Sequence, residues 1–178
     1  MTQFKNTISC NAYSKVGIAD YKINVNQEGL VTLGLGSCVG ICIFDIHKRV
    51  GGLAHVMLPD SPSDNDSEKS KLKYTQYTLP KMIDEMIALG CSKMNMRAVL
   101  VGGGNMFLNT KITLENSIGY RNLQSVQQIL NQYSIPVVAQ DVGGNVGKTV
   151  YFDLDEGDVY VKIGLDIYKL YGKKEDKN

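Results

Sequence analysis

The stretch that decides the fold is GLVTLGLGSCVGICIF, at residues 29–44, which carries no charged side chain. Within it, residues 30–33 predict a buried strand and residues 34–37, with two glycines, predict a tight turn. Residues 39–46 predict a second apolar strand. The stretch is shorter than the roughly 20 apolar residues that a membrane helix needs, and Gly, Thr and Ser interrupt it.

The next segment predicts a hairpin. Residues 47–49 (His-Lys-Arg) form a polar turn, and residues 50–57 read as a third strand that ends before Pro59. If the second and third strands pair around this turn, their far ends meet. Cys38 and His55 would then lie near one another at one edge of the sheet.

The rest of the chain alternates apolar and polar segments. Residues 60–73 (DSPSDNDSEKSKLK) contain almost nothing to bury and predict a mobile surface loop. Helical spacing of apolar residues predicts helices around 79–89 and around 123–133. In the first of these, Pro80 belongs in a first turn or marks a kink, and Gly90 is a stop. Further strands are predicted at 21–25, 98–101, 136–142, 148–154 and 159–163. Two helices among seven or eight strands predict a layered α+β fold, with residues 1–172 as a single domain and 173–178 as a disordered tail.

Composition excludes several function classes. The chain has 178 residues and a formal net charge of +1, which gives no general attraction to nucleic acid or to anionic membranes. Its N-terminus has polar or charged residues every few positions and no apolar core of a secretory signal. We therefore expect a cytoplasmic protein that does not bind nucleic acid or insert into a membrane.

Two ligand sites are weighed and disfavoured. Residues 143–149 (GGNVGKT) superficially resemble a phosphate-binding loop, but their glycine spacing is wrong, and a β-branched, aromatic strand follows where that loop needs a helix. Cys38, Cys42, His47 and His55 could nominally hold zinc. Structural zinc sites take paired ligands from short knuckles, whereas Cys42 lies in an apparent buried strand, so we expect no metal.

Cysteine chemistry is the stronger hypothesis. A thiol must ionise to act as a nucleophile, and a neighbouring imidazole can take its proton. Cys38 follows a glycine turn, and His55 is the histidine that the hairpin brings to it; a buried histidine in a strand is otherwise most often a satisfied core residue. The imidazole also needs an orienting partner. Thr32 can bring a hydroxyl to the same end of the sheet, although a strand-forming role explains it equally well.

Five motifs together resemble the CheD family of chemoreceptor glutamine deamidases. They are TLGLGSCV (32–39), GGLAHVMLP (51–59), GGGNMF (102–107), IGYRN (118–122) and DVGGNVGK (141–148). The resemblance covers about residues 20–165. It implies an α/β/β layered sandwich, similar to cysteine-dependent bacterial toxins that deamidate a glutamine on small GTPases. One departure is Lys148, where the family more often has an arginine.

The resemblance also implies a Cys–His–Thr site. Cys38 would be the nucleophile, His55 the general base and then acid, and Thr32 the residue that orients His55. The enzyme would convert specific Gln residues of methyl-accepting chemotaxis receptors to Glu through a thioester, releasing ammonia, with no metal or cofactor. Backbone amides near residues 36–38 are candidate oxyanion donors. The family also binds the CheC phosphatase, so a non-catalytic adaptor for receptors and CheC is the alternative.

Overall fold

The structure, a computed structural model, describes residues 13–25, 28–106 and 113–172. Two five-stranded sheets lie face to face. The central sheet has the order β2 (Asp20–Asn24), β5 (Val50–Val56), β4 (Val39–Asp45), β6 (Met96–Gly102) and β7 (Val137–Val142). The outer sheet has the order β1 (Tyr13–Val16), β3 (Gly29–Leu35), β8 (Lys148–Asp153), β9 (Asp158–Ile163) and β10 (Asp166–Tyr171).

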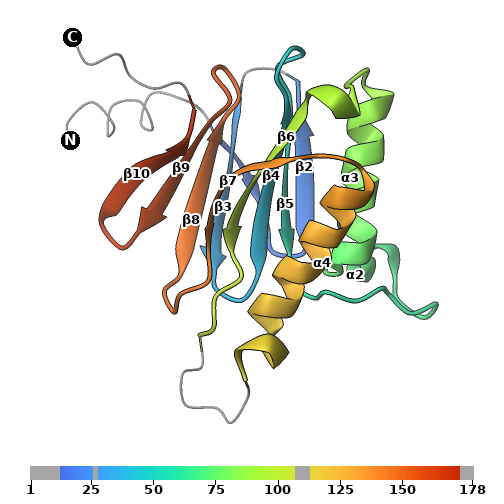
Figure 1. The fold of residues 1–178 in the computed structure, drawn as a ribbon. Coiled ribbons are helices and arrows are strands. Elements are labelled where there is room, and N and C mark those ends of the chain that lie inside the picture. The colour runs from blue at the N-terminus through green and yellow to red at the C-terminus, as the bar shows by residue number, and fades with distance from the viewer. Residues whose placement is uncertain (1–12, 26–27, 107–112, 173–178) are drawn as a thin grey trace.

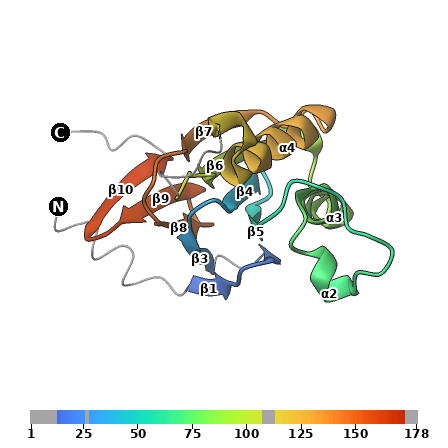
Figure 2. The ribbon, with the colours of Figure 1, turned by 90° about the horizontal axis from the view of Figure 1, so that it is seen from below.

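Helices cover the other face of the central sheet. They are α3 (Thr75–Ala88) and α4 (Ile118–Gln132), with the single-turn α2 (Glu68–Lys71) beside α3. Two short 3-10 turns, Lys93–Asn95 and Leu114–Asn116, precede β6 and α4. Figures 1 and 2 show the resulting order of layers, with the helices on one side, the central sheet in the middle and the outer sheet on the far side.

The central sheet has a hydrophobic core on each face. All seven residues of β4 are buried, and alternate side chains point to opposite faces. Ile41 and Ile43 pack with α3 and α4, whereas Cys42 and Phe44 pack against the outer sheet. Burial on both faces explains why residues 39–44 form a continuous apolar run rather than an alternating one.

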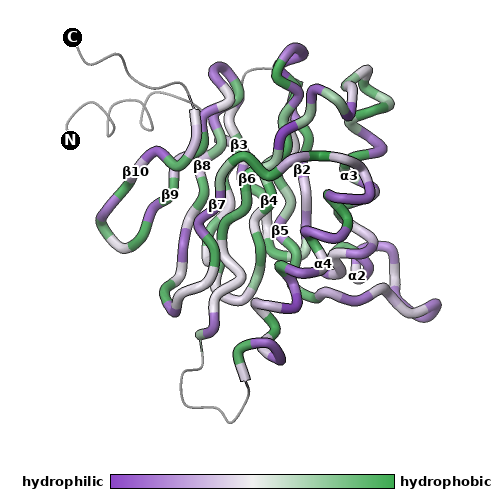
Figure 3. The backbone as a smooth tube through the Cα atoms, viewed as in Figure 1, coloured by the Kyte–Doolittle hydropathy of each residue, from purple (hydrophilic) through white to green (hydrophobic). Residues whose placement is uncertain are grey.

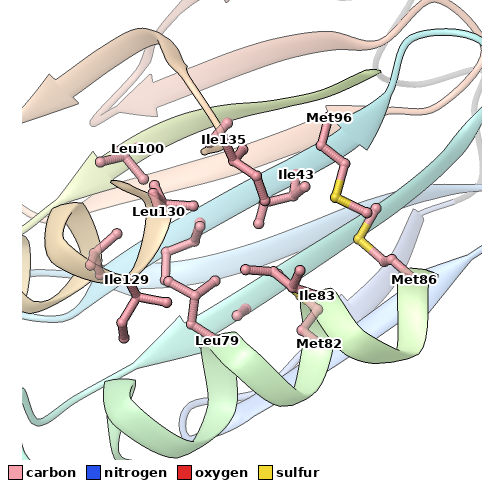
Figure 4. Close-up of a cluster of buried hydrophobic side chains, with 14 of the residues drawn as sticks. Ile43, Leu79, Met82, Ile83, Met86, Met96, Leu100, Ile129, Leu130 and Ile135 are labelled. Atoms are coloured by element: carbon pink, nitrogen blue, oxygen red, sulfur yellow. The ribbon is translucent and has the colours of Figure 1, made fainter. Parts of the chain in front are cut away.

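The core under the helices is visible in detail. Figure 4 shows side chains of α3, among them Leu79, Met82 and Met86, meeting Leu130 of α4 and Ile43 of β4. Figure 3 shows the same concentration of hydrophobic residues along the strands of the central sheet. Within the described ranges, no helix is both long enough and apolar enough to cross a membrane.

The predicted α+β class, the two long helices and the hairpin of residues 39–57 are confirmed. β4 and β5 pair antiparallel from Val39–Val56 to Asp45–Val50. Both helices begin earlier than predicted, since α3 starts at Thr75 and α4 follows its N-cap Ser117, whose hydroxyl accepts a hydrogen bond from the Tyr120 amide. Pro80 therefore lies inside α3 rather than in its first turn.

Four expectations need correction. The predicted loop 60–73 contains α2, capped by Ser67, and β1 and β10 were not predicted. The strand predicted at 30–33 extends to Leu35, so the turn begins later than expected. Thr32, expected at the same end of the sheet as Cys38 and His55, lies in β3 of the outer sheet. That residues 1–172 form one domain stays a prediction, and the tail 173–178 lies outside the described residues.

Candidate active site between the two sheets

The turn that carries Cys38 is where the chain crosses from the outer sheet to the central sheet. β3 ends at Leu35 and β4 begins at Val39, so residues 36–38 connect the two layers. Cys38 is half-buried and packs against the core between the sheets. A residue at this crossing can be reached by groups from both layers.

The hairpin register places His55 beside this turn. Gly40 of β4 lies opposite His55 of β5, and Cys38 is two residues before Gly40. Side chains alternate along a strand, so His55 lies on the same face of the hairpin as Gly40, and Cys38, just before β4 begins, packs into the core on that face. That face is the one toward the outer sheet. Gly40 makes room there, since a Cβ atom on it would lie 2.7 Å from Cδ1 of Leu35.

Thr32 reaches His55 from the outer sheet. Its Oγ1 lies 2.8 Å from Nδ1 of His55 and 2.9 Å from the carbonyl oxygen of Val16, and both Thr32 and His55 are fully buried. The hydroxyl has one proton, which it donates to the Val16 carbonyl. Nδ1 of His55 must then carry a proton and donate it to Oγ1, which assigns the tautomer.

This tautomer leaves Nε2 of His55 as a free acceptor. Nε2 is buried and has no hydrogen-bond partner among the described residues. Nε2 is the basic atom of the ring, because Nδ1 holds the proton and Nε2 keeps its lone pair. The arrangement therefore presents a proton acceptor on the same face of the hairpin as Cys38.

Burial sets the charge of both groups. It lowers the pKa of His55 to about 4, since the imidazolium would be desolvated between the sheets. Burial also raises the pKa of the Cys38 thiol, and a hydrogen bond from its own backbone N–H opposes this in part. At neutral pH the pair is therefore a neutral thiol and a neutral imidazole, and the thiol needs a base to react.

The glycine segments hold the Cys38 turn in place. The amide N–H groups of Gly103 and Gly104 donate to the carbonyls of Cys38 and Gly36, both at 2.8 Å. Gly102 has φ +103°, and a Cβ atom there would lie 2.3 Å from the Cys38 carbonyl oxygen. Only glycine allows the backbone to approach so closely.

Residues 141–148 in turn contact the end of β6 at Gly102. The Gly143 amide donates to the Gly102 carbonyl at 2.8 Å. The buried Lys148 donates through Nζ to the Asp141 carboxylate at 2.8 Å, to the Asp141 carbonyl at 3.1 Å and to the Gly143 carbonyl at 3.3 Å. Three oxygens around one ammonium suit a point charge, so Lys148 fills this position without the fork of an arginine. Lys148 also begins β8, so a strand follows the glycines where a phosphate-binding loop needs a helix.

The zinc set does not assemble. His47 lies in the turn at one end of the hairpin, whereas His55 pairs with Gly40 near the other end. Cys42 is fully buried in the core between the sheets. In the parts of the chain that the structure describes, no three His, Cys, Asp or Glu side chains gather as metal ligands would.

Sequence reasoning missed one polar residue at the site. Asn122 of α4 is fully buried, and its Nδ2 donates to the carbonyls of Ser37 and Met57. The motif IGYRN contained this residue, but its type and its place in a helix gave no sign of these contacts.

A separate groove of about 820 Å³ lies between β2, α2 and α3, and Thr32, Cys38 and His55 are not among its lining residues.

Comparison with known proteins gives a consistent family. The family model described as CheD chemotactic sensory transduction matches residues 57–163. A protein of Clostridium botulinum (strain Hall) named "Probable chemoreceptor glutamine deamidase CheD" is 40% identical over 152 residues, which are 85% of this chain and 93% of the relative. A protein of the same name from Clostridium kluyveri is 40% identical over 157 residues, covering 88% and 96%.

A search of solved structures adds little. The crystal structure of the Bacillus licheniformis hypothetical protein YfiH has a TM-score of 0.44 and 15% identity, covering 69% of this chain and 49% of that one. The family model begins after Thr32, Cys38 and His55, so only the geometry of those three residues supports their roles. The family match and the two relatives together show that this chain belongs to the CheD family.

Proposed function

We propose that this protein is an enzyme that deamidates glutamine side chains of methyl-accepting chemotaxis receptors during chemotactic adaptation. The relatives' names support the activity and the substrate. The observation that carries the proposal is the Thr32–His55 hydrogen bond at 2.8 Å, which leaves Nε2 free on the face that Cys38 shares. In this proposal Cys38 is the nucleophile, His55 the base and Thr32 the orienting group, which are the roles that acyl transfer to a thiol requires.

The first half of the reaction transfers the glutamine acyl group to sulfur. Nε2 of His55 takes the Cys38 proton as Sγ attacks the side-chain carbonyl carbon of the substrate Gln. The carbon–nitrogen bond of the tetrahedral intermediate then breaks, and His55 returns the proton to the departing ammonia. A thioester between Cys38 and the substrate remains.

The second half hydrolyses the thioester. His55 removes a proton from water as its oxygen attacks the thioester carbon, and the carbon–sulfur bond breaks. Sγ recovers the proton, and the substrate leaves as Glu. Thr32 keeps Nδ1 protonated throughout, so that Nε2 is always the atom that exchanges protons. All of these steps use the chain and water, and no cofactor enters them.

The surroundings of Cys38 support a protein substrate. Three apolar side chains on the segments next to the site are 41% to 60% exposed: Ile18, Met106 and Val146. Ile18 adjoins Ala19, whose amide donates to the His55 carbonyl, and Met106 lies near Gly36. Exposed apolar residues gathered around a site are typical of surfaces that bind another protein. We call these three residues the apolar rim.

Three further expectations accompany this function and stay predictions. They are a cytoplasmic location, binding to a CheC phosphatase, and the likeness of the fold to cysteine-dependent deamidase toxins. The oxyanion donors expected near residues 36–38 also stay a prediction.

Peptide mass spectrometry of a receptor cytoplasmic fragment tests the proposal. The fragment is incubated with the wild-type protein, with Cys38→Ala, or with Cys91→Ala. Cys91 is a buried cysteine in the core on the helix side of the central sheet, so it is a matched control for removing a thiol. We expect amide-to-acid conversion at specific glutamines with the wild type and Cys91→Ala, and none with Cys38→Ala.

Two results would contradict the proposal. Conversion that persists with Cys38→Ala would exclude this thiol as the nucleophile. An absence of conversion across several receptors, with binding of a receptor or of CheC in the same samples, would instead favour the adaptor.

A further inference from the structure

Asn122 lies at the point where the hairpin stops pairing. Its Nδ2 donates to the Ser37 carbonyl at 3.0 Å and to the Met57 carbonyl at 2.8 Å. The last pair of the β4–β5 ladder before this point is Val39–Val56. Ser37 immediately precedes Cys38, and Met57 is two residues after His55. The amide thus joins the two strand ends just beyond the last backbone pair.

Chemistry fixes the orientation of this amide. Both partners are carbonyl oxygens, so only the NH2 group can face them, and its two protons are both used. The remaining atom, Oδ1, is buried and has no hydrogen-bond partner among the described residues. A fully buried asparagine with an unpaired oxygen costs stability relative to an apolar side chain, so core packing alone does not explain it.

Backbone hydrogen bonds fix the Cys38 turn mainly against the glycine segment that follows β6. Gly103 and Gly104 hold the Cys38 and Gly36 carbonyls. Among the described residues, the side chain that ties this turn to the strand carrying His55 is Asn122. Misplacing reacting atoms by about 1 Å can cost roughly 100-fold in rate, so this tie bears on catalysis.

We propose that Asn122 is a positioning residue that holds Cys38 and His55 in register with each other. The inference rests on the proposed roles of those two residues. Asn122→Leu is the test variant, because leucine keeps the same branched shape, removes both hydrogen bonds and also removes the unpaired oxygen. Asn122→Asp is the second variant, since it keeps the shape but places carboxylate oxygens against two carbonyls.

The main experiment measures how His55 affects the alkylation of Cys38. The rate of Cys38 modification by iodoacetamide is followed by peptide mass spectrometry in the wild type, in His55→Gln, in each Asn122 variant and in the corresponding double variants. In the wild-type background, His55→Gln should change the rate several-fold. In the Asn122 backgrounds, the same change should have no effect, because the two groups are no longer held together.

Ser125→Ala is the matched control. Ser125 is three residues along the same helix, and its buried hydroxyl donates to the Pro59 carbonyl at 2.7 Å. The variant removes this hydrogen bond and the one that Oγ of Ser125 accepts from Nε2 of Gln76 on α3 at 2.9 Å. Thermal unfolding of all variants measures the loss of stability. In the Ser125→Ala background, His55→Gln should have its full effect on the alkylation of Cys38. Ser125→Ala alone should keep the wild-type kcat. Asn122→Leu should lower kcat for deamidation roughly 10- to 100-fold with little change in KM.

Three outcomes would overturn the inference, and they are distinguishable. If His55→Gln does not change Cys38 alkylation in the wild-type background, the Cys38–His55 pair fails, and the proposed mechanism fails with it. If the effect of His55→Gln persists in both Asn122 variants, only the role of Asn122 fails. If Ser125→Ala removes the effect as fully as Asn122→Leu, general destabilisation explains both variants.

Discussion

The buried imidazole of His55 should make stability depend on pH in a range where carboxylates contribute little. Burial lowers its pKa in the folded protein from 6.5 to about 4. Between these values the unfolded chain binds a proton at His55 and the folded chain does not. The free energy of unfolding therefore rises with pH through this window, and the stability contributed by neutral His55 is lost as the pH falls below 6.5.

The size of the effect follows from the shift. One pKa unit corresponds to about 1.4 kcal/mol, so the full difference is roughly 3 kcal/mol near pH 4. Between pH 7 and pH 5 the expected loss is roughly 2 kcal/mol. The lowered pKa values of Asp45, Asp66 and Glu68 act below this interval, because their contributions are lost only as those carboxylates become protonated.

Urea unfolding at pH 7, 6 and 5 measures this dependence. His55→Gln removes the titrating group, so the unfolding free energy of this variant should fall less between pH 7 and pH 5. This holds whatever the stability of the variant at pH 7. The chain has only two histidines, so His47→Gln, at an exposed position in the hairpin turn, is the matched control and should keep the wild-type decline. An equal decline in the wild type and in His55→Gln would refute the reasoning that burial holds this imidazole neutral.

Further predictions concern activity and the supporting contacts. Because the pKa of His55 is about 4, kcat/KM should stay high below pH 6.5 and fall only near pH 4 to 5; a fall by half near pH 6.5 would show an imidazole of ordinary pKa. Thr32→Val should lower kcat and cost about 1–3 kcal/mol of stability, because it leaves Nδ1 of His55 and the Val16 carbonyl unpaired; wild-type kcat would remove the orienting role. Lys148→Met should cost about 1–3 kcal/mol in urea unfolding, and an unchanged midpoint would show that its contacts are weak. Val146→Glu in the apolar rim should raise KM for the receptor fragment and leave thermal unfolding unchanged; an unchanged KM would exclude this residue from substrate binding.

Sequence patterns predicted the parts of the fold that bury long apolar runs. β4 and β5 are buried along their whole length, so their pattern was clear and the hairpin followed. β10 is partly or fully exposed at every position and β1 has only four residues, so neither gave an apolar signal. α2 forms through its cap at Ser67 and buries no side chain, which is why its segment was interpreted as a loop.

The site was predictable to the extent that hairpin geometry determines it. The antiparallel pairing of β4 and β5 around a short turn sets Gly40, two residues after Cys38, opposite His55. Thr32 could not be placed by the same reasoning, because β3 belongs to the outer sheet and reaches His55 across the core. Asn122 depends on how α4 packs on the strand ends, which no local pattern encodes.

Interception of the thioester tests the central claim most directly. Hydroxylamine added to the reaction of the wild-type protein with a receptor fragment should convert the target glutamines to hydroxamates in competition with Glu, because it attacks an acyl group held on Cys38. Mass spectrometry should find these hydroxamates at the same positions that become Glu, and neither product with Cys38→Ala. Conversion to Glu alone at high hydroxylamine, or products of either kind with Cys38→Ala, would contradict a mechanism in which Cys38 carries the acyl group.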